Sequence, residues 1–339
     1  RPPTPRPSEP RSMPLGAISA PSLLLRRGAL VAALPALSRS GRAAMLSSGA
    51  PAAFDGEVSA LYSRMFEQHM HERGPWKKII SAMESSLPSL AQGGRVLDLG
   101  TGPGEPANMI ARGMPAVSVC ATDPSDDMLN KARARMSGLP NVQFAQVDAQ
   151  DLSRYEDESF DAVTACYVYM FPEDKERALR ETYRVLKPGG KLFATYWTEL
   201  AMMSLLRDTM TGVLGFTPPP PAINPLVLAP DDLFDGMLKD AGFAQTEFSV
   251  GAYPFDLGDN PEFQYALGTM LAKEKLDEIP DGHAKAKPLF LSKMPHYYWD
   301  PDVDRKQQAA TGAAGASAAG GAAKIGPNRF VLAVATKAP

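Results

Sequence analysis

Between residues 91 and 200 the chain alternates short apolar runs with longer segments of helical periodicity. The apolar runs have the length and the β-branched composition of buried strands, and they lie at 95–100, 116–123, 142–148, 160–169 and 191–197. Helical spacing fills the gaps at 105–114, 125–136 and 173–186, and Ser125 is the candidate N-cap of the second of these helices. A strand-then-helix order repeated in this way predicts a doubly wound, mostly parallel α/β sheet.

The flanking segments extend this pattern on both sides. Residues 57–87 have helical spacing with a break at Gly74-Pro75, which predicts a helical N-terminal extension. Beyond the core, the spacing predicts helices at 231–243 and 261–279 and strands at 245–250 and 328–337. Because the last strand is apolar on both faces, we expect it to pair back into the same sheet, which would then be seven-stranded.

Two stretches between these elements fit neither period. Residues 198–228 combine methionines with four consecutive prolines and are expected to form an irregular insertion. Residues 308–323 are almost pure Ala and Gly, so they cannot build a core and are expected to form a flexible loop inside a second insertion, 258–325. The pattern therefore predicts one domain over 55–337, with a ligand-binding core at 91–200 and both insertions on the substrate side.

The first 54 residues have a different composition from the rest. They hold seven arginines, no lysine and one acid, Glu9, and they are rich in Pro, Ala and Ser. This composition is typical of an organelle transit peptide, which predicts a plastid location, with the mitochondrion as the alternative. A disordered tail without an address is the other interpretation.

Charge and cysteine content narrow the class of partner. The whole chain has 35 basic and 38 acidic residues, and setting aside the seven arginines and Glu9 leaves a body with 28 basic and 37 acidic residues. A body this acidic is a poor partner for nucleic acid. The two cysteines, Cys120 and Cys166, are too few for a disulfide framework and lack zinc-type spacing. No uninterrupted apolar run reaches the ~20 residues of a membrane span.

The stretch "VLDLGTGPGEP" at 96–106 holds the strongest candidate chemistry. An acid near the end of the first predicted strand, Asp98, is followed by glycines at every second position, where the backbone can approach a ligand closely. The dinucleotide pattern G-x-G-x-x-G fails because position 105 is Glu, and a pyrophosphate would be repelled by Asp98 and Glu105. These residues favour a positively charged ligand without phosphate, such as S-adenosylmethionine.

Two further acids end the next strands. Asp123 ends the second predicted strand, where a carboxylate can accept hydrogen bonds from both hydroxyls of a ribose. Asp148 ends the third, where it can accept from an adenine amine. Each acid alone is as easily explained as a solvated strand end. Three acids at the ends of three successive strands, with the glycine turn between them, predict a nucleoside-binding edge.

In this order, "VLDLGTGPG", "ATDPSDDML", "VDAQDL", "FDAVTACYVY" and "RVLKPGGKLFATYW" resemble the motifs of class I S-adenosylmethionine-dependent methyltransferases. The nearest group is type 11, which includes the quinone-biosynthesis C-methyltransferases. The resemblance covers residues 58–200 well, and 230–250 and 328–337 loosely. It implies a Rossmann-like methyltransferase fold with S-adenosylmethionine as the cofactor.

The resemblance also implies a cofactor-binding set, namely Tyr62, Asp98, Gly100, Thr101, Gly102, Gly104, Asp123, Pro124, Met128, Asp148, Ala149, Cys166 and Tyr167. In it the glycines line the methionine part of the cofactor, and Asp123 holds the ribose. Met128 and residues 148–149 lie against the adenine. Residues 166–167 face the reactive side, and Tyr62 closes over the cofactor.

Methyl transfer from a sulfonium is an in-line displacement, so the protein mainly has to align the reactants and exclude water. A general base is required only if the nucleophile must lose a proton. The weak candidates are His69, His71, Tyr167 and His296. His69 and His71 are two positions apart, so they cannot share one helix face, and the pattern favours exposed helix histidines over a base near the cofactor. His296 lies in the aromatic stretch "MPHYYWD", which either lines a substrate pocket or packs within the C-terminal region.

The expected acceptor is a small, partly apolar organic molecule. The insertions hold side chains that could form an adaptable apolar pocket, namely Met202, Met203, Phe216, Tyr297, Tyr298 and Trp299, although core packing explains the same residues almost as well. Two other functions are also compatible with the sequence. One is a non-catalytic cofactor-binding or assembly module with the same fold, and the other, disfavoured by Asp98 and Glu105, is a nucleotide-dependent oxidoreductase.

Overall fold

The computed structural model describes residues 63, 65–220, 224–301 and 323–339. Three features of the sequence lie outside the described residues. They are the predicted targeting segment 1–54, the candidate cofactor residue Tyr62 and nearly all of the Ala/Gly stretch 308–323.

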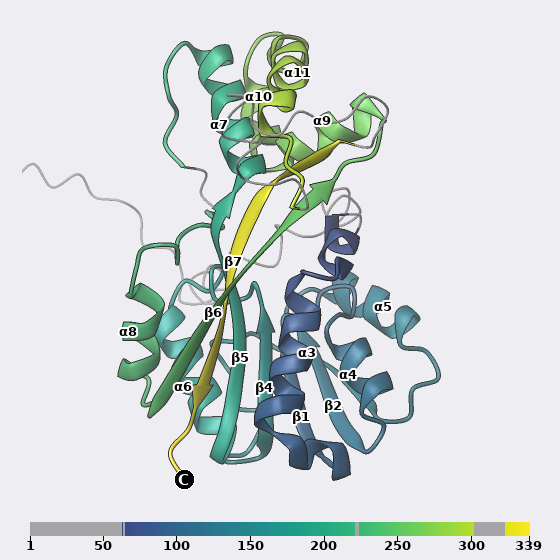
Figure 1. Cartoon of the computed structure of the whole chain (residues 1–339), viewed down its shortest axis with the longest axis vertical. Helices are drawn as coiled ribbons and strands as arrows, with labels where there is room; N and C mark the ends of the chain where they lie inside the picture. The colour runs from purple at the N-terminus through teal and green to yellow at the C-terminus, as the bar shows by residue number, and fades with distance from the viewer. Residues whose placement is uncertain (1–62, 64, 221–223, 302–322) are drawn as a thin grey trace, which may run out of the picture. The chain divides into compact units, whose positions relative to one another are not determined.

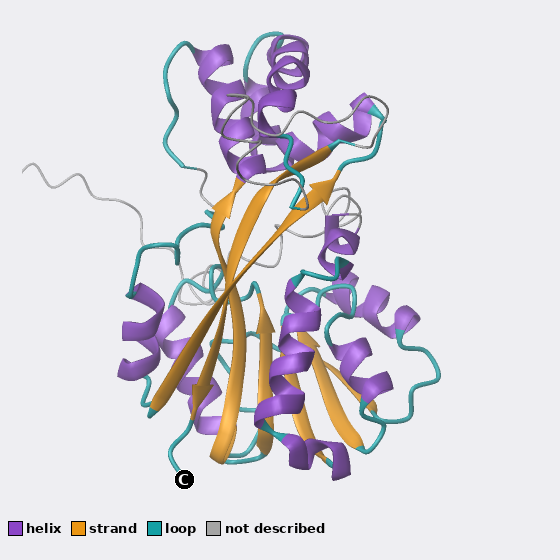
Figure 2. Cartoon of the chain, viewed as in Figure 1, coloured by secondary structure: helices purple, strands orange, loops and turns teal. Residues whose placement is uncertain are grey.

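Within the described residues, seven strands form one sheet in the order β3-β2-β1-β4-β5-β7-β6 (Figures 1 and 2). The strands are β1 (Gly94–Leu99), β2 (Val117–Asp123), β3 (Val142–Gln146), β4 (Phe160–Cys166), β5 (Leu186–Leu200), β6 (Gln245–Asp256) and β7 (Lys324–Thr336). Strands β1 to β5 are parallel, and β7 runs antiparallel between β5 and β6. The doubly wound, mostly parallel fold and the return of the last strand are both confirmed.

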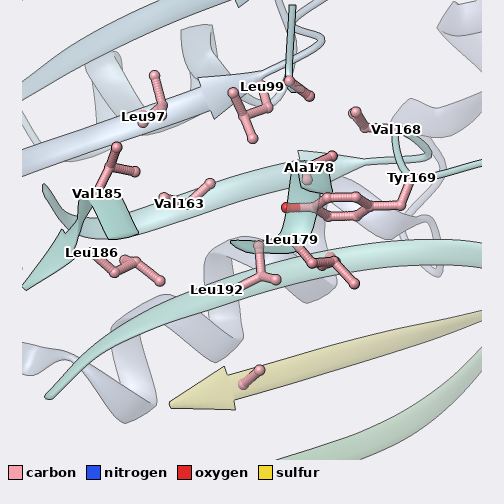
Figure 3. Packing of buried hydrophobic residues seen from close by; sticks show 14 of the residues in the cluster. Leu97, Leu99, Val163, Val168, Tyr169, Ala178, Leu179, Val185, Leu186 and Leu192 are labelled. Atoms are coloured by element: carbon pink, nitrogen blue, oxygen red, sulfur yellow. The ribbon is translucent and has the colours of Figure 1, made fainter. Parts of the chain in front are cut away.

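Helices cover both faces of the sheet. One face is covered by α3 (Pro75–Ser86), α4 (Ala107–Gly113) and α5 (Asp126–Arg135), and the other by α6 (Lys175–Val185) and α8 (Leu233–Asp240) (Figure 1). Alternation along β1 supplies both cores, since Val96 packs on the α3 side and Leu97 on the α6 side. Figure 3 shows the second of these cores, where Leu97, Leu99 and Val163 meet side chains of α6.

A group of helices, here called the helical cap, packs on the far ends of β5, β6 and β7 (Figure 1). It consists of α7 (Ala201–Leu214), α9 (Pro261–Thr269), α10 (Lys273–Glu278) and α11 (Gly282–Lys293), with the short 3-10 turns η4 (Met270–Ala272) and η5 (Met294–Tyr297). The side chain of Asn328 on β7 ties these parts together. It is wholly buried, accepts from the Ala201 amide at 3.1 Å and donates to the Ile325 carbonyl at 2.9 Å.

Several local predictions are confirmed. The Ser125 hydroxyl caps α5 by accepting from the Met128 amide at 3.3 Å. The helical extension breaks at Gly74, between the 3-10 turn η2 (Glu67–Met70) and α3, while a second such turn, η3 (Pro88–Gln92), leads into β1. A glycine is required at position 74, because a Cβ there would lie 2.3 Å from the His69 carbonyl oxygen.

Other predictions were wrong or incomplete. Residues 198–228 are not an irregular insertion throughout, because 201–214 form α7, whose buried side carries Met202, Leu205 and Leu206. The predicted helix 261–279 is divided into α9, η4 and α10. The helix α11 was not predicted, and the sixth strand is twice as long as expected, with its second half buried beside the cap.

Candidate active site

A cavity lies where β1, β2 and β4 end, and we call it the cofactor cleft. With its open mouth it encloses about 850 Å³. It is lined by Leu99, Gly100, Gly102, Asp123, Pro124, Ser125, Met128, Val147, Asp148, Ala149, Gln150, Cys166, Tyr167, Val168, Phe171 and Pro172. Most of the predicted cofactor residues therefore meet in one place. The wall residues that were not predicted to bind the cofactor are Leu99, Ser125, Val147, Gln150, Val168, Phe171 and Pro172, whose types carry no specific sequence signal.

The carboxylate of Asp123 connects the glycine turn to the end of β2. Its Oδ2 accepts from the Gly102 amide at 2.9 Å, and its Oδ1 accepts from the Ser125 amide at 2.9 Å. Gly100 and Gly102 both adopt positive φ, and a Cβ at Gly100 would approach the Val168 side chain to 2.7 Å. The turn thus needs glycine for its backbone conformation and for its close packing.

Asp98 does not line the cleft but is wholly buried beneath the glycine turn. The Thr164 hydroxyl donates to its Oδ1 at 2.5 Å. Its Oδ2 and the Thr101 hydroxyl have no hydrogen-bond partner of normal geometry, although the nearby Thr101 hydroxyl lowers the pKa of the acid. Burial dominates and raises the pKa of Asp98 to about 7. A buried carboxylate oxygen without a partner fits a site for a positively charged ligand.

Glu105 and Gly104 have structural roles at this edge. The buried Glu105 carboxylate accepts from Asn108 Nδ2 at 2.6 Å and from the Met109 amide at 3.0 Å, at the start of α4. It therefore places negative charge where a dinucleotide fold binds pyrophosphate, which argues against a nicotinamide or flavin ligand. Gly104 faces α5, and a Cβ there would lie 3.3 Å from the Ala132 Cα.

A second cavity, here called the acceptor cleft, adjoins the first and encloses about 730 Å³. The two cavities share Tyr167 and Phe171. The remaining wall of the acceptor cleft consists of Met65, His69, Met170, Trp197, Leu200, Met202, Met203, Leu206, Pro225, Phe255, Leu267, Gly268, Met270 and Leu271. Among the described residues in this wall, none carries a formal charge.

Only part of the predicted acceptor pocket lies here. Met202 and Met203 line the acceptor cleft. Phe216 does not, and 60% of its surface is exposed. Tyr297, whose hydroxyl donates to Asp208 at 2.6 Å, and its neighbours 298–299 also lie outside the cleft wall. Of the two interpretations of the stretch that contains 297–299, packing within the C-terminal region is therefore the one observed, because this segment packs against the start of β7.

Tyr167 stands between the two clefts in an unusual backbone conformation. Its φ is +60°, in the left-handed region that few non-glycine residues adopt. Its ring stacks on Trp197 with centroids 4.0 Å apart and planes 6° apart, and its hydroxyl lies 3.3 Å from that of Tyr253. Beside it, burial raises the pKa of the Cys166 thiol to about 12, so this thiol stays protonated.

Of the three candidate histidines, one reaches a cleft. His69 is 2% exposed, lines the acceptor cleft and shares a 2.6 Å hydrogen bond between its Nδ1 and the Tyr253 hydroxyl. Burial lowers the pKa of His69 to about 3. The expectation that it could be an exposed helix residue was wrong. His71 accepts from the Arg73 amide at 3.1 Å outside the cleft wall, and His296 is exposed.

Comparison with known proteins decides the family. A family model described as a methyltransferase domain matches residues 96–190. The chain is 32% identical over 195 residues to the ubiquinone/menaquinone biosynthesis C-methyltransferase of Vibrio cholerae. The matched region covers 51% of this chain and 71% of that protein. The chain belongs to the class I S-adenosylmethionine-dependent methyltransferase family. This methyltransferase resembles the quinone-biosynthesis type, and its cofactor is S-adenosylmethionine.

Other similarities of the methyltransferase are shorter or more distant. It is 43% identical over 100 residues to the demethylmenaquinone methyltransferase of Thermus thermophilus, covering 29% of this chain and 44% of that protein. Among solved structures, a phosphoethanolamine N-methyltransferase 2 of Haemonchus contortus is 18% identical with a TM-score of 0.46, covering 83% of this chain and 57% of that one. None of the methyltransferase's described helices is long and apolar enough to cross a membrane.

Proposed function

We propose that this methyltransferase transfers a methyl group to a small, largely apolar organic acceptor bound in the acceptor cleft. The observation that carries the proposal is the junction of the two clefts at Tyr167 and Phe171. A cofactor-binding edge opens there directly onto an uncharged wall rich in methionine and aromatic side chains. Such a wall adapts to apolar molecules and offers a charged acceptor no counter-ion.

We propose that different acids bind different parts of the cofactor. The Oδ2 of Asp98, which has no hydrogen bond of normal geometry, places a buried acid next to the glycine turn and is the group best suited to the positive charge of the methionine part. Asp123 and Asp148 line the cleft and remain the proposed partners of ribose and adenine, with Met128 against the base. Thr101, Gly100, Gly102 and their neighbours in the turn supply the close backbone approach.

When bound, S-adenosylmethionine supplies a methyl group that its sulfonium already activates. The residues of the chain align the acceptor and keep water away from it. Tyr167 and Trp197 form a rigid stacked pair at the junction, and the methionines of α7 close the apolar side. His69 is a poor proton acceptor because its pKa is low, so the structure supports positioning more than base catalysis.

A labelled-methyl screen tests the proposal. The full chain is incubated with small-molecule extracts and S-adenosylmethionine carrying a deuterated methyl group, and products are detected by mass spectrometry. We expect label to appear in apolar metabolites. Label confined to charged, polar metabolites would contradict the proposal. Binding of the cofactor without any labelled product would favour a non-catalytic module.

A matched pair of variants at Met203 connects the product to the acceptor cleft. Met203→Asp places a charge in its wall, and Met203→Leu nearly conserves volume and polarity. Because Met203 is only partly buried, both variants are expected to fold and to bind the cofactor normally. We expect the Asp variant to lose product and the Leu variant to keep most of it. Equal activity of the pair would place the acceptor elsewhere.

For residues 1–54 we propose an organelle address, on the strength of their arginine-rich and nearly acid-free composition. A fluorescent protein carrying residues 13–54 at its N-terminus is expected to enter a plastid or, as the alternative, a mitochondrion. Diffuse fluorescence in the cytosol would contradict this.

A further inference from the structure

His69 occupies an enclosure of aromatic rings. It lies in η2, and its ring centroid is 5.2–6.0 Å from those of Phe66, Trp76, Tyr167, Trp197, Tyr253 and Phe255. The segment itself is fixed in place, because the Gln68 side chain accepts from the Asp256 amide of β6 at 2.7 Å. A polar ring held this firmly in an apolar enclosure needs a reason beyond packing, since Phe would fill the same space without a polar group to satisfy.

Among the residues that the structure describes, only one nitrogen of the His69 imidazole has a hydrogen-bond partner. Nδ1 shares a 2.6 Å hydrogen bond with the Tyr253 hydroxyl, which lies 3.3 Å from the Tyr167 hydroxyl. Among the described residues, no other hydrogen bond reaches the ring, and His69 is one of the residues that line the acceptor cleft. The second nitrogen, Nε2, is therefore available to a molecule in that cleft.

The imidazole offers hydrogen bonding without charge. No carboxylate is present among the described residues of the acceptor cleft wall to stabilise a proton on the ring, and the enclosure around it is aromatic. Burial in these surroundings lowers the pKa of His69 to about 3, so the ring is neutral at physiological pH. A neutral imidazole carries one donor and one acceptor nitrogen, and the Tyr253 hydroxyl can accept from or donate to Nδ1.

We propose that His69 is a specificity-determining residue of the acceptor cleft, whose Nε2 selects a neutral, apolar acceptor carrying a hydroxyl group near Tyr167. A hydroxyl can both donate and accept, so it pairs with either tautomer of the ring, whereas a carbonyl pairs with only one. An acceptor without the hydroxyl leaves Nε2 buried and unpaired, and a cationic acceptor finds no counter-ion. The proposal rests on the proposed function, because it assumes that acceptors bind in this cleft.

Binding of three probes that share one ring system tests the proposal without requiring turnover. The probes are 1-naphthol, naphthalene and 1-naphthylmethylammonium, titrated by calorimetry into the full chain saturated with S-adenosylhomocysteine. We expect 1-naphthol to bind roughly 5- to 10-fold more tightly than naphthalene, which is the effect of one neutral hydrogen bond, and the ammonium to bind most weakly. In His69→Phe the 1-naphthol affinity falls to that of naphthalene, whose own affinity changes less than about twofold.

Three controls separate hydrogen bonding from a change in cleft shape. His296→Phe makes the same substitution at an exposed site and is expected to leave the probe ratio unchanged. His69→Gln keeps an amide within reach of the Nε2 position and is expected to restore part of the preference. If His69→Phe fails to bind S-adenosylhomocysteine, nitrogen NMR of the wild-type imidazole replaces it, with a shift of Nε2 expected for 1-naphthol and none for naphthalene.

The outcomes distinguish the role of His69 from the binding of the acceptor in this cleft. An unchanged naphthol-to-naphthalene ratio in His69→Phe, or a ratio near one in the wild type, overturns the role of His69 and leaves the acceptor cleft intact. Strongest binding of the ammonium probe also overturns it, since the enclosure would then be a cation site. Failure of the wild type to bind any of the probes, together with equal activity of the Met203 pair, contradicts the proposed function itself.

Discussion

Replacing Asp98 with Asn should change folding stability and cofactor affinity in opposite directions. Without ligand, the Asp98 carboxylate is wholly buried, and Thr164 is its only hydrogen-bond donor of normal geometry within the described residues. An Asn side chain keeps the acceptor oxygen for Thr164 and removes the buried charge. The unliganded variant is therefore expected to be more stable than the wild type, although the substitution lies in the proposed cofactor site.

The size of this effect follows from the pKa of Asp98, which burial raises from 3.8 to about 7. When folding raises the pKa of a carboxyl, the stability that this carboxyl contributes is fully present below the pKa of the unfolded state. That stability is lost as the pH rises through the pKa of the folded state. The loss amounts to about 4 kcal/mol as an upper bound above pH 7, and to less than about half of that at pH 5. Asp98→Asn does not titrate, so its advantage should grow between pH 4 and pH 7 and then level off.

Urea unfolding of the unliganded wild type and variant at pH 5 and pH 8 measures the difference directly. Calorimetry with S-adenosylmethionine at pH 8 should show weaker binding to the variant, because the positive ligand loses its buried partner. A second titration at pH 7, where Asp98 is partly protonated, should release protons from the wild type when the ligand binds, and this release should disappear in the variant. A variant less stable than the wild type at pH 8, or a stability difference independent of pH, would falsify the assignment of Asp98 as a strained buried acid.

The remaining predictions concern the glycine turn, His69 and the last strand. Asp123→Ala should weaken S-adenosylmethionine binding by about 1–3 kcal/mol in calorimetry and lower the melting temperature slightly, because two amides lose their acceptor; unchanged affinity would remove Asp123 from the site. Gly102→Val should abolish cofactor binding, since a β-branched residue resists a φ of +53° and its Cβ would face Phe66; normal methylation by this variant would refute the placement. The fold lowers the pKa of His69 to about 3, so the stability that the neutral ring contributes is present above pH 6.5 and is lost as the pH falls. Between pH 7.5 and pH 5, His69→Phe should therefore lose about 2 kcal/mol less unfolding free energy than the wild type, as measured by urea unfolding. Parallel curves of unfolding free energy against pH would contradict this. A chain ending at residue 327 should aggregate, because β7 pairs with both β5 and β6; a soluble monomer by light scattering would show that β7 is dispensable.

Strand-end acids and turn glycines could be predicted because the residues next to them in the sequence identify their positions. Asp123 and Asp148 follow apolar runs, and parallel strands bring such positions to one edge regardless of side-chain detail. The condition of Asp98 could not be predicted in the same way. Its burial depends on the turn that follows it and on Thr164 of β4, and Thr164 lies 66 positions away in the sequence.

The acceptor side was harder to predict for a related reason. The helix α7 carries apolar residues on more than one side, and α11 contains Pro288, so neither gives a clean helical period. His69 meets Tyr253 across 184 positions, a distance over which no spacing rule operates. The aromatic stretch at 297–299 suggested a pocket by composition alone, whereas the aromatic rings of the cleft come from β5, from β6 and from the segment after β4.

The three long strands β5, β6 and β7 have a mechanical consequence. Each runs without interruption from the main sheet into the helical cap, and the wholly buried Asn328 links β7 to the first residue of α7. Across the described residues, the cap is therefore joined to the sheet by a twisted β-ribbon as well as by the single chain that leads from α7 to α8. Motion that admits an acceptor must come from flexing of this ribbon or sliding of the cap helices, because hinge rotation would break paired strands. The same continuity makes the cap and the sheet one cooperative unit, so their slowest-exchanging amide hydrogens should share a single unfolding event.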